Sequence, residues 1–191
     1  MKKILSFAVI SLLALSVAGC AMNNKKQERK EDLPMPEKPK ATKVAVIETE
    51  KGNIVFKFFP DDAPKTVDNF VTLTNQGYYN GLTFHRVVKS PTPFVIQGGD
   101  PKGDGTGGPG YTIPAEFNAR PHLEGTVAMA RTEDPNSAGS QFYICLAPQP
   151  FLNGKYTVFG QVIEGLENIH KINAGDKMIA VRIEERVLVK K

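Results

Sequence analysis

The stretch QGGDPKGDGTGGPG, from Gln97 to Gly110, decides between two fold classes. Within it Gly103, Gly105 and Gly108 have the GxGxxG spacing of a dinucleotide-binding loop, which in an α/β fold follows a strand and opens a helix. A strand-like run, FVIQ, does lead into the stretch, but PGYTIPAEF follows it, with two prolines and no helical period. No helix N-terminus is therefore expected to face a phosphate. The stretch predicts a tight surface loop whose glycines adopt positive φ angles, and no nucleotide site.

Short runs of β-branched and aromatic residues occupy most of the chain from residue 43 onward. They are KVAVIETE and NIVFKFF around a turn at Lys51-Gly52-Asn53, then TFHRVV, FVIQGG, TVAMA, QFYICLA, TVFGQVI and IAVRIEERVLVK. Their length and the turn residues between them are typical of β-strands. Together with two helices they predict a mainly β fold, a closed eight-stranded antiparallel β-barrel capped by two α-helices, because closure removes exposed strand edges.

The two helices are expected at PKTVDNFVTLTNQ and EGLENIHKIN. In the first, apolar residues recur at helical spacing and Gly77 ends the pattern; Asp61 and Asp62 precede it in the position of an N-cap. In the second, Leu166, Ile169 and His170 fall on one face.

The first 42 residues differ in composition from the rest. Residues 1–19 have two lysines, an apolar run and small residues, which predicts a cleaved signal peptide, and VAGC ending at Cys20 resembles the lipobox of bacterial lipoproteins. The alternative is an ordinary secretory signal with an incidental cysteine. Residues 20–42 would then be a lipidated Cys20 followed by a polar, proline-containing tether that cannot bury enough surface to fold. These features predict a lipid-anchored protein of the cell envelope, outside the cytoplasm.

Charge argues against a nucleic-acid partner. From Lys43 onward the chain has sixteen Lys/Arg and sixteen Asp/Glu, so the folded part is formally neutral. A nucleic-acid-binding protein needs a basic face that displaces counterions. We therefore expect no nucleic acid among its partners.

Familiar catalytic and metal-binding patterns are missing from the sequence. The three histidines are far apart, no CxxC or HxxxH pair suggests a metal, and Ser140 lacks the GxSxG context of a serine nucleophile. Cys145 lies in the apolar run QFYICLA, where a buried, inert thiol is expected. The sequence predicts neither metal nor cofactor.

Six blocks in order, FHRVV, FVIQGGD, GTGGPGY, AGSQFYI, FLNGKYTVFG and VIEGLENIHKI, resemble the cyclophilin family of peptidyl-prolyl cis-trans isomerases. The resemblance covers residues 43–191, and implies that this part is a cyclophilin-like isomerase domain with the family's eight-stranded barrel and two helices. It also implies an enzyme that accelerates rotation about Xaa-Pro bonds in envelope or exported proteins and assists their folding.

Site residues follow from the same resemblance. It implies that Arg86, Phe94 and Gln97 are catalytic. The residues that it implies bind substrate are Val95, Ala130, Arg131, Gln141, Tyr143, Phe151, Leu152 and Tyr156.

The chain departs from the family pattern at several of these positions. Lys89–Phe94, KSPTPF, is about three residues longer than the usual PGF between the arginine and the pocket phenylalanine. Phe151 replaces a frequent tryptophan, Tyr156 a common histidine, and Tyr143 a common phenylalanine whose extra hydroxyl is expected at the rim of the pocket.

Isomerisation of an Xaa-Pro bond suits a site without a nucleophile. Isomerisation breaks amide resonance, a barrier of about 20 kcal/mol, but makes no bond. The alternative is a non-catalytic module, a chaperone that binds proline-containing peptides on the same fold. In either case the expected partners are unfolded or exported polypeptides that contain proline, and the protein is expected to be a monomer.

Overall fold

The computed structural model describes residues 41–188. The predicted signal peptide, residues 1–19, and Cys20 with nearly all of the tether lie outside the described residues. Strand β1 begins at Ala41, so the last two residues assigned to the tether belong to the sheet. Within residues 41–188 no helix has both the length and the hydropathy needed to cross a membrane.

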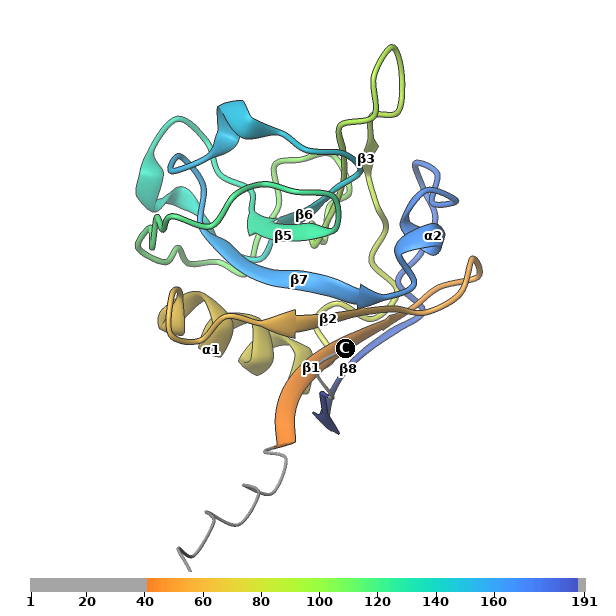
Figure 1. Cartoon of the computed structure of the whole chain (residues 1–191), viewed down its shortest axis with the longest axis horizontal. Coiled ribbons are helices and arrows are strands. Elements are labelled where there is room, and N and C mark those ends of the chain that lie inside the picture. Colours follow the sequence, from red (N-terminus) through yellow and green to blue (C-terminus); the bar gives the residue numbers. More distant parts are fainter. Residues whose placement is uncertain (1–40, 189–191) are drawn as a thin grey trace, which may run out of the picture. The chain divides into compact units, whose positions relative to one another are not determined.

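Eight antiparallel strands form one sheet, in the order β3-β4-β6-β5-β7-β2-β1-β8 (Figure 1). The strands are β1 (Ala41–Glu48), β2 (Ile54–Phe58), β3 (Arg86–Val87), β4 (Val95–Gly98), β5 (Thr126–Met129), β6 (Phe142–Cys145), β7 (Val158–Glu164) and β8 (Ala180–Val187). The helices are α1 (Pro64–Asn75) and α2 (Leu166–Ile169), with 3-10 turns η1 (Pro135–Ser137) and η2 (Pro150–Leu152). The mainly β fold with eight antiparallel strands and two helices is confirmed.

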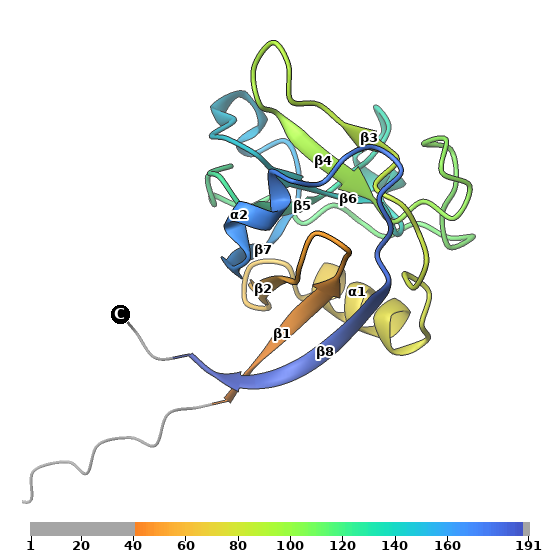
Figure 2. The ribbon, with the colours of Figure 1, turned by 90° about the vertical axis from the view of Figure 1, so that its right-hand side faces the viewer.

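Closure of the barrel is not confirmed. Strands β3 and β8 stand at the two ends of the sheet, and no ladder joins them within residues 41–188. The reason is the length of β3, which has only two residues and pairs with β4 on its other side. Only the segments before the two strands meet, where Thr83 and Lys177 form an isolated bridge and the Phe84 amide donates to the Asp176 carbonyl at 2.9 Å. Figure 2 shows the segment before β8 running beside β3 and β4.

The main core lies between the inner face of the sheet and α1. Aromatic rings from helix and strands meet there, with Phe70 of α1 stacked on Tyr79 at 4.7 Å between centroids and edge-on to Phe56 and Phe142. Edge-to-face and offset contacts of this kind add to the stabilisation that comes from burial alone. The apolar positions predicted for the first helix therefore face the core.

The N-terminus of α1 is capped by a residue from a distant loop, and the N-cap predicted at Asp61 and Asp62 is wrong. The N-cap position is Ala63, which offers no side-chain oxygen. Instead the Glu116 carboxylate accepts the amides of Lys65 at 3.0 Å and Thr66 at 2.8 Å, and also the Thr66 hydroxyl at 2.8 Å. Because Pro64 has no N–H, these bonds satisfy the free amides of the first turn.

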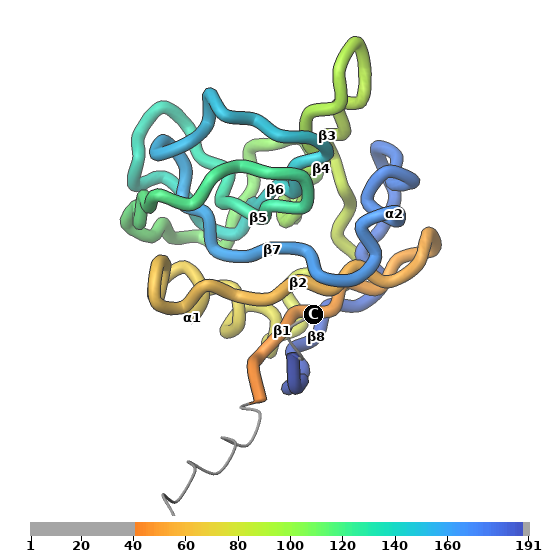
Figure 3. The backbone as a smooth tube through the Cα atoms, viewed as in Figure 1, coloured from red at the N-terminus to blue at the C-terminus, as the bar shows by residue number. Residues whose placement is uncertain are grey.

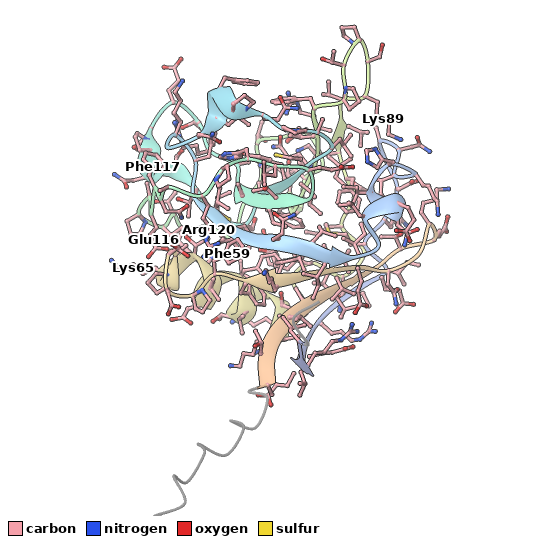
Figure 4. All side chains as sticks on the ribbon, viewed as in Figure 1. Phe59, Lys65, Lys89, Glu116, Phe117 and Arg120 are labelled. Atoms are coloured by element: carbon pink, nitrogen blue, oxygen red, sulfur yellow. The ribbon has the colours of Figure 1, made fainter. Side chains whose placement is uncertain are left out.

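Figure 4 shows Glu116 beside Phe117, Arg120, Phe59 and Lys65 at the start of α1. Asp62 has a different partner there, since its carboxylate accepts from Arg120 Nε at 2.7 Å. The Arg120 guanidinium also lies 3.4 Å from the centre of the Phe59 ring. The loop that carries Glu116 is thus fixed against the helix by several contacts.

Helix α2 is shorter than the sequence predicts. Four residues are helical, and the Lys171 amide donates to the Asn168 carbonyl at 3.0 Å, a three-residue spacing that ends the helix. Ile169 is fully buried, but His170 is exposed and its Nε2 lies 2.6 Å from Glu124 Oε1. Of the three residues predicted to share one face, only Ile169 is therefore buried.

We predict that Glu116→Ala lowers the free energy of unfolding by about 1–2 kcal/mol, because two backbone amides and one hydroxyl lose their acceptor. Urea denaturation at pH 7 measures the effect. Asp61→Ala is the matched control and is expected to change stability by less than about 0.5 kcal/mol. Equal effects of the two substitutions would contradict the assigned cap.

Candidate active site

Strand alternation creates a second apolar layer on the outer face of the sheet. In β4, β5 and β6 the side chains of one set, such as Ile96 and Ile144, enter the main core. The other set forms a separate buried cluster that includes Val95, Tyr143 and Cys145. Both faces of these strands are buried, which explains their nearly continuous apolar sequences.

The register across the strands aligns the polar members of the site. Arg86 of β3 pairs with Gln97 of β4, and Gln97 pairs with Tyr143 of β6. Directly opposite residues of an antiparallel sheet project from the same face. These three side chains therefore form one row across the sheet, on its outer face.

A cavity of about 280 Å³ lies above this row. It is lined by Arg86, Phe94, Val95, Gln97, Ala130, Arg131, Tyr143, Phe151, Leu152 and Tyr156. The structure thus brings together every site residue inferred from the resemblance except Gln141. Strands β3, β4 and β6 supply the floor, and the turn η2 supplies two of the walls.

The Arg86 guanidinium stands at the edge of the cavity without an acidic partner. Its Nη1 donates to Gln97 Oε1 at 3.2 Å, and its Cζ lies 5.5 Å from the centre of the Phe94 ring. No ion pair of residues 41–188 includes Arg86. Its remaining N–H groups can therefore donate to a bound molecule.

The longer loop at 89–93 leaves Phe94 in the cavity. The Phe94 amide donates to the Val88 carbonyl at 2.9 Å, and its carbonyl accepts from the Leu146 amide at 2.9 Å. The ring stacks on Phe151 with 5.8 Å between centroids, and Phe151 is 59% exposed. The inserted residues project beyond β3 (Figure 3), where Lys89 Nζ donates to Asn173 Oδ1 at 3.3 Å. The insertion thus extends one edge of the site and leaves its aromatic wall in place.

Arg131 lines the cavity, but most of its N–H groups already donate to backbone carbonyls. The guanidinium donates to the carbonyls of Lys155 at 3.0 and 3.2 Å and of Thr132 at 2.7 Å. Its Cζ also lies 4.6 Å from the centre of the Tyr156 ring. Arg131 therefore fixes the loop that carries the Tyr156 wall.

Gln141 links the site to a second, larger cavity of about 720 Å³, which Gln97 also lines. Gln97 Nε2 donates to Gln141 Oε1 at 2.9 Å, and Gln141 Nε2 donates to the carbonyls of Gly105 and Gly107 at 2.9 Å. A chain of hydrogen bonds thus runs from Arg86 to the glycine-rich loop. The sequence placed this loop at the surface but gave no sign that it forms the wall of a cavity.

The glycine-rich loop uses its amides to bind a carboxylate of the protein. Buried Asp100 accepts the Lys102 amide at 2.8 Å and the Gly105 amide at 2.6 Å. Burial acts to raise the pKa of Asp100, but the bonds from these and neighbouring amides outweigh it and lower the pKa below its usual value. A Cβ at Gly107 would collide with the same carboxylate. No helix begins within the stretch, so the expectation of a loop is confirmed.

Tyr143 does not place its hydroxyl at the rim, so that expectation is wrong. The residue is buried, and its Oη lies 3.0 Å from Nε2 of His122, which is 1% exposed. His122 is a polar neighbour of the site that sequence reasoning missed, because a lone histidine between a proline and a leucine carries no motif. Cys145 lies in the same buried layer, and burial raises its pKa to about 12, as expected for an inert thiol.

The fold and the site together define a family. Residues 44–191 match the family model of the cyclophilin-type peptidyl-prolyl cis-trans isomerases. The chain is 52% identical to a peptidyl-prolyl cis-trans isomerase of Synechococcus elongatus over 141 residues, 73% of this chain and 94% of the relative. It is 51% identical to peptidyl-prolyl cis-trans isomerase B of Bacillus subtilis over 138 residues, 71% of this chain and 94% of the relative.

Solved structures agree with these sequence matches. A crystal structure of a cyclophilin-type isomerase of Cryptosporidium parvum superimposes with a TM-score of 0.68 at 32% identity, covering 77% of this chain and 99% of that one. A second structure of the parasite protein, determined in the presence of the dipeptide Ala-Pro, gives a TM-score of 0.64 at 32% identity and covers 78% and 99% of the two chains. The chain belongs to the cyclophilin family and is a peptidyl-prolyl cis-trans isomerase.

We predict that Asp100→Asn destabilises the protein by about 1–3 kcal/mol at pH 7, because an amide group would face backbone N–H donors. The pKa of Asp100 is lowered in the folded state, so its stabilisation is complete above the ordinary value near 3.8 and is lost as the pH falls through the lowered value. The difference between wild type and variant should therefore shrink toward pH 2.

Urea titrations at a series of pH values measure this difference. Asp68→Asn on α1 is the control, because Asp68 is exposed. This substitution is expected to leave the free energy of unfolding and its dependence on pH unchanged. A difference that stays constant from pH 7 to pH 2 would show that the Asp100 charge does not stabilise the loop.

Proposed function

We propose that Arg86 is the catalytic residue and that the cavity of about 280 Å³ binds the proline ring of an Xaa-Pro bond. The observation that carries this proposal is a guanidinium with no carboxylate partner at the edge of a largely apolar cavity. Such a cavity favours a pyrrolidine ring, and the guanidinium supplies the one fixed positive charge that the chemistry needs.

The reaction asks for stabilisation of a twisted imide. When the bond rotates, amide resonance is lost and the prolyl nitrogen regains a lone pair, which a fixed N–H donor can bind. Arg86 donates to this nitrogen or holds the preceding carbonyl oxygen, and either interaction is weaker in the planar ground state. A typical turnover of ~10 to 10³ per second against about 10⁻² per second uncatalysed requires roughly 4–7 kcal/mol.

The other side chains contact either the proline ring or the backbone of the bound peptide. Phe94, Val95, Tyr143 and Leu152 enclose the pyrrolidine ring, while Gln97 holds Arg86 in place through its Oε1 atom. Phe151 and Tyr156 form the outer walls. Ala130, Arg131 and Gln141 border the path of the peptide that leads into the cavity.

The substrates are polypeptides that contain proline. The structure of the Cryptosporidium parvum relative determined in the presence of Ala-Pro supports this class of ligand. The longer loop at 89–93 was the feature that favoured a non-catalytic binding module. Because Phe94 remains in the cavity beside Arg86, that feature gives the alternative no further support.

We also propose that the protein is a monomeric lipoprotein of the cell envelope that assists the folding of exported proteins. The support is the sequence pattern of residues 1–20, with a signal-like apolar run that ends in VAGC, and the polar tether that follows. Cys20 would carry the lipid. In a Gram-negative cell Ala21 favours sorting to the outer membrane; in a Gram-positive cell the anchor would lie in the outer leaflet of the plasma membrane.

We expect Arg86→Ala to lower kcat/KM by about tenfold or more, mainly through kcat, because the donor acts on the transition state. A chymotrypsin-coupled or NMR exchange assay on an Ala-Pro peptide measures it, and circular dichroism should show an unchanged fold. Arg86→Lys keeps the charge without the planar fork and should retain an intermediate activity. An Arg86→Ala variant within about twofold of wild type would remove Arg86 from the mechanism.

We expect Cys20→Ser in the full chain to abolish incorporation of labelled palmitate and to move the protein from the membrane fraction to the soluble fraction, because the lipid is the anchor. Cys145→Ser is the matched control and should stay with the membrane. If the Cys20→Ser protein remains membrane-bound and labelled, the lipoprotein proposal is lost, whatever the isomerase activity.

A further inference from the structure

His122 lies behind the floor of the cavity and contacts Tyr143 and Asn153. Its Nε2 is 3.0 Å from Tyr143 Oη, and the two rings are nearly parallel, at 17°. On the other side its Nδ1 is 3.1 Å from Asn153 Oδ1. Tyr156, a wall of the cavity, lies edge-on to the imidazole at 6.5 Å. The side chain is 1% exposed, so water does not replace these contacts.

The backbone fixes which protons these contacts use. The His122 amide donates to Asn153 Oδ1 at 2.8 Å, so the Asn153 atom near His122 must be the acceptor oxygen. His122 Nδ1 faces the same oxygen and must therefore carry its own proton to form a hydrogen bond. In the neutral ring this leaves Nε2 as an acceptor. The Tyr143 hydroxyl then donates to Nε2 and points away from the cavity.

Titration behaviour agrees with this arrangement. Burial lowers the pKa of His122, against a smaller opposing effect of the bond to Asn153, and so favours the neutral ring at pH 7. Burial also raises the pKa of the Tyr143 phenol, Cys145 and Tyr156 raise it slightly further, and a smaller lowering effect of Arg131 does not reverse this, so the hydroxyl keeps its proton. The donor and the acceptor are both in the state that the geometry requires.

We propose that His122 is a positioning residue of the isomerase: as the neutral Nδ1–H tautomer it accepts the Tyr143 hydroxyl proton and thereby fixes the ring that forms the floor of the proline cavity. The inference rests on the proposed function, since it takes this cavity to be the proline site. His122 itself does not line the cavity, so it acts through the side chains that it contacts, and its one side-chain hydrogen bond to a lining residue is the one to Tyr143.

The kinetic consequence differs from that of Arg86. The pyrrolidine ring stays in its place while the other side of the bond rotates, so the floor contacts the ring equally in ground state and transition state. Loss of such uniform binding raises KM and leaves kcat nearly unchanged. A displaced Tyr143 should therefore weaken substrate binding without slowing rotation.

Two substitutions at His122 separate the two halves of its role. In His122→Asn the amide N–H can replace Nδ1–H toward Asn153, but nothing reaches Tyr143. In His122→Gln the longer side chain can offer an oxygen to the Tyr143 hydroxyl, as Nε2 does. We expect KM to rise by about fivefold for His122→Asn with kcat within about twofold, and the Gln variant to recover most of the loss.

A double-mutant cycle with Tyr143→Phe isolates the pair. In the Tyr143→Phe background His122→Asn should raise KM by less than about twofold, because the hydroxyl that it positions is already absent. Additive effects on KM, or a variant that only lowers the thermal midpoint of unfolding, would overturn the proposal. Arg86→Ala is measured in parallel, to distinguish failure of the His122 proposal from failure of the proposed function. If Arg86→Ala keeps full activity, it is the proposed function that is wrong.

The tautomer provides a test that needs no variant. Long-range ¹H–¹⁵N NMR spectra of the full-length wild-type protein at pH 7.5 should show His122 with Nδ1 protonated and Nε2 unprotonated. A ring protonated at Nε2 would place the hydrogen bond in the opposite sense and overturn the assignment. This result holds even where a substitution at His122 prevents folding.

Discussion

Burial on both faces of β4, β5 and β6 is the constraint on which the rest of the structure depends. One set of alternating side chains fills the main core, and the other set, which includes Val95, Tyr143 and Cys145, forms the layer beneath the cavity. Successive side chains of a strand project from opposite faces of the sheet. A one-residue shift in the register of these strands would therefore move the side chains of each layer to the other face. The register that buries the core is therefore also the register that aligns Arg86, Gln97 and Tyr143 in one row.

Several polar groups in and around this row bind other groups of the protein, whereas Arg86 has one hydrogen bond, to Gln97, and no acidic partner among residues 41–188. The amides of the glycine-rich loop bind Asp100, and those of the first turn of α1 bind Glu116. Gln97 and Gln141 pass a hydrogen bond from Arg86 to that loop. Hydrogen bonds that link Gln97, Gln141 and the glycine-rich loop hold these groups in place, while the Arg86 guanidinium at the cavity keeps N–H groups without a partner. Rigid support around one uncommitted charge suits an enzyme that must bind a distorted bond.

How far the sequence predicts this structure depends on how far apart the interacting residues are. Strand alternation, the end of α1 near Gly77 and the loop at Gln97–Gly110 follow from neighbours in sequence, and the structure confirms them. The cap on α1 could not be foreseen, since Glu116 is fifty residues from Thr66 and no local pattern links them. Barrel closure depends on whether β3 pairs with β8 as well as with β4, and composition does not show how long β3 is. The site residues came from family resemblance, so His122, which lies outside the quoted blocks, was not among them.

The cavity lies over the outer face of the sheet, between strands and the loops that follow them. A polypeptide can therefore lie across the cavity and continue on both sides of it, with both of its ends far from the site. In the binding mode proposed above, no chain end has to be threaded, and the contact is confined to the proline ring and its adjoining peptide groups. Bound in this way, prolines in the middle of a long, partly folded chain would be as accessible as those near a terminus.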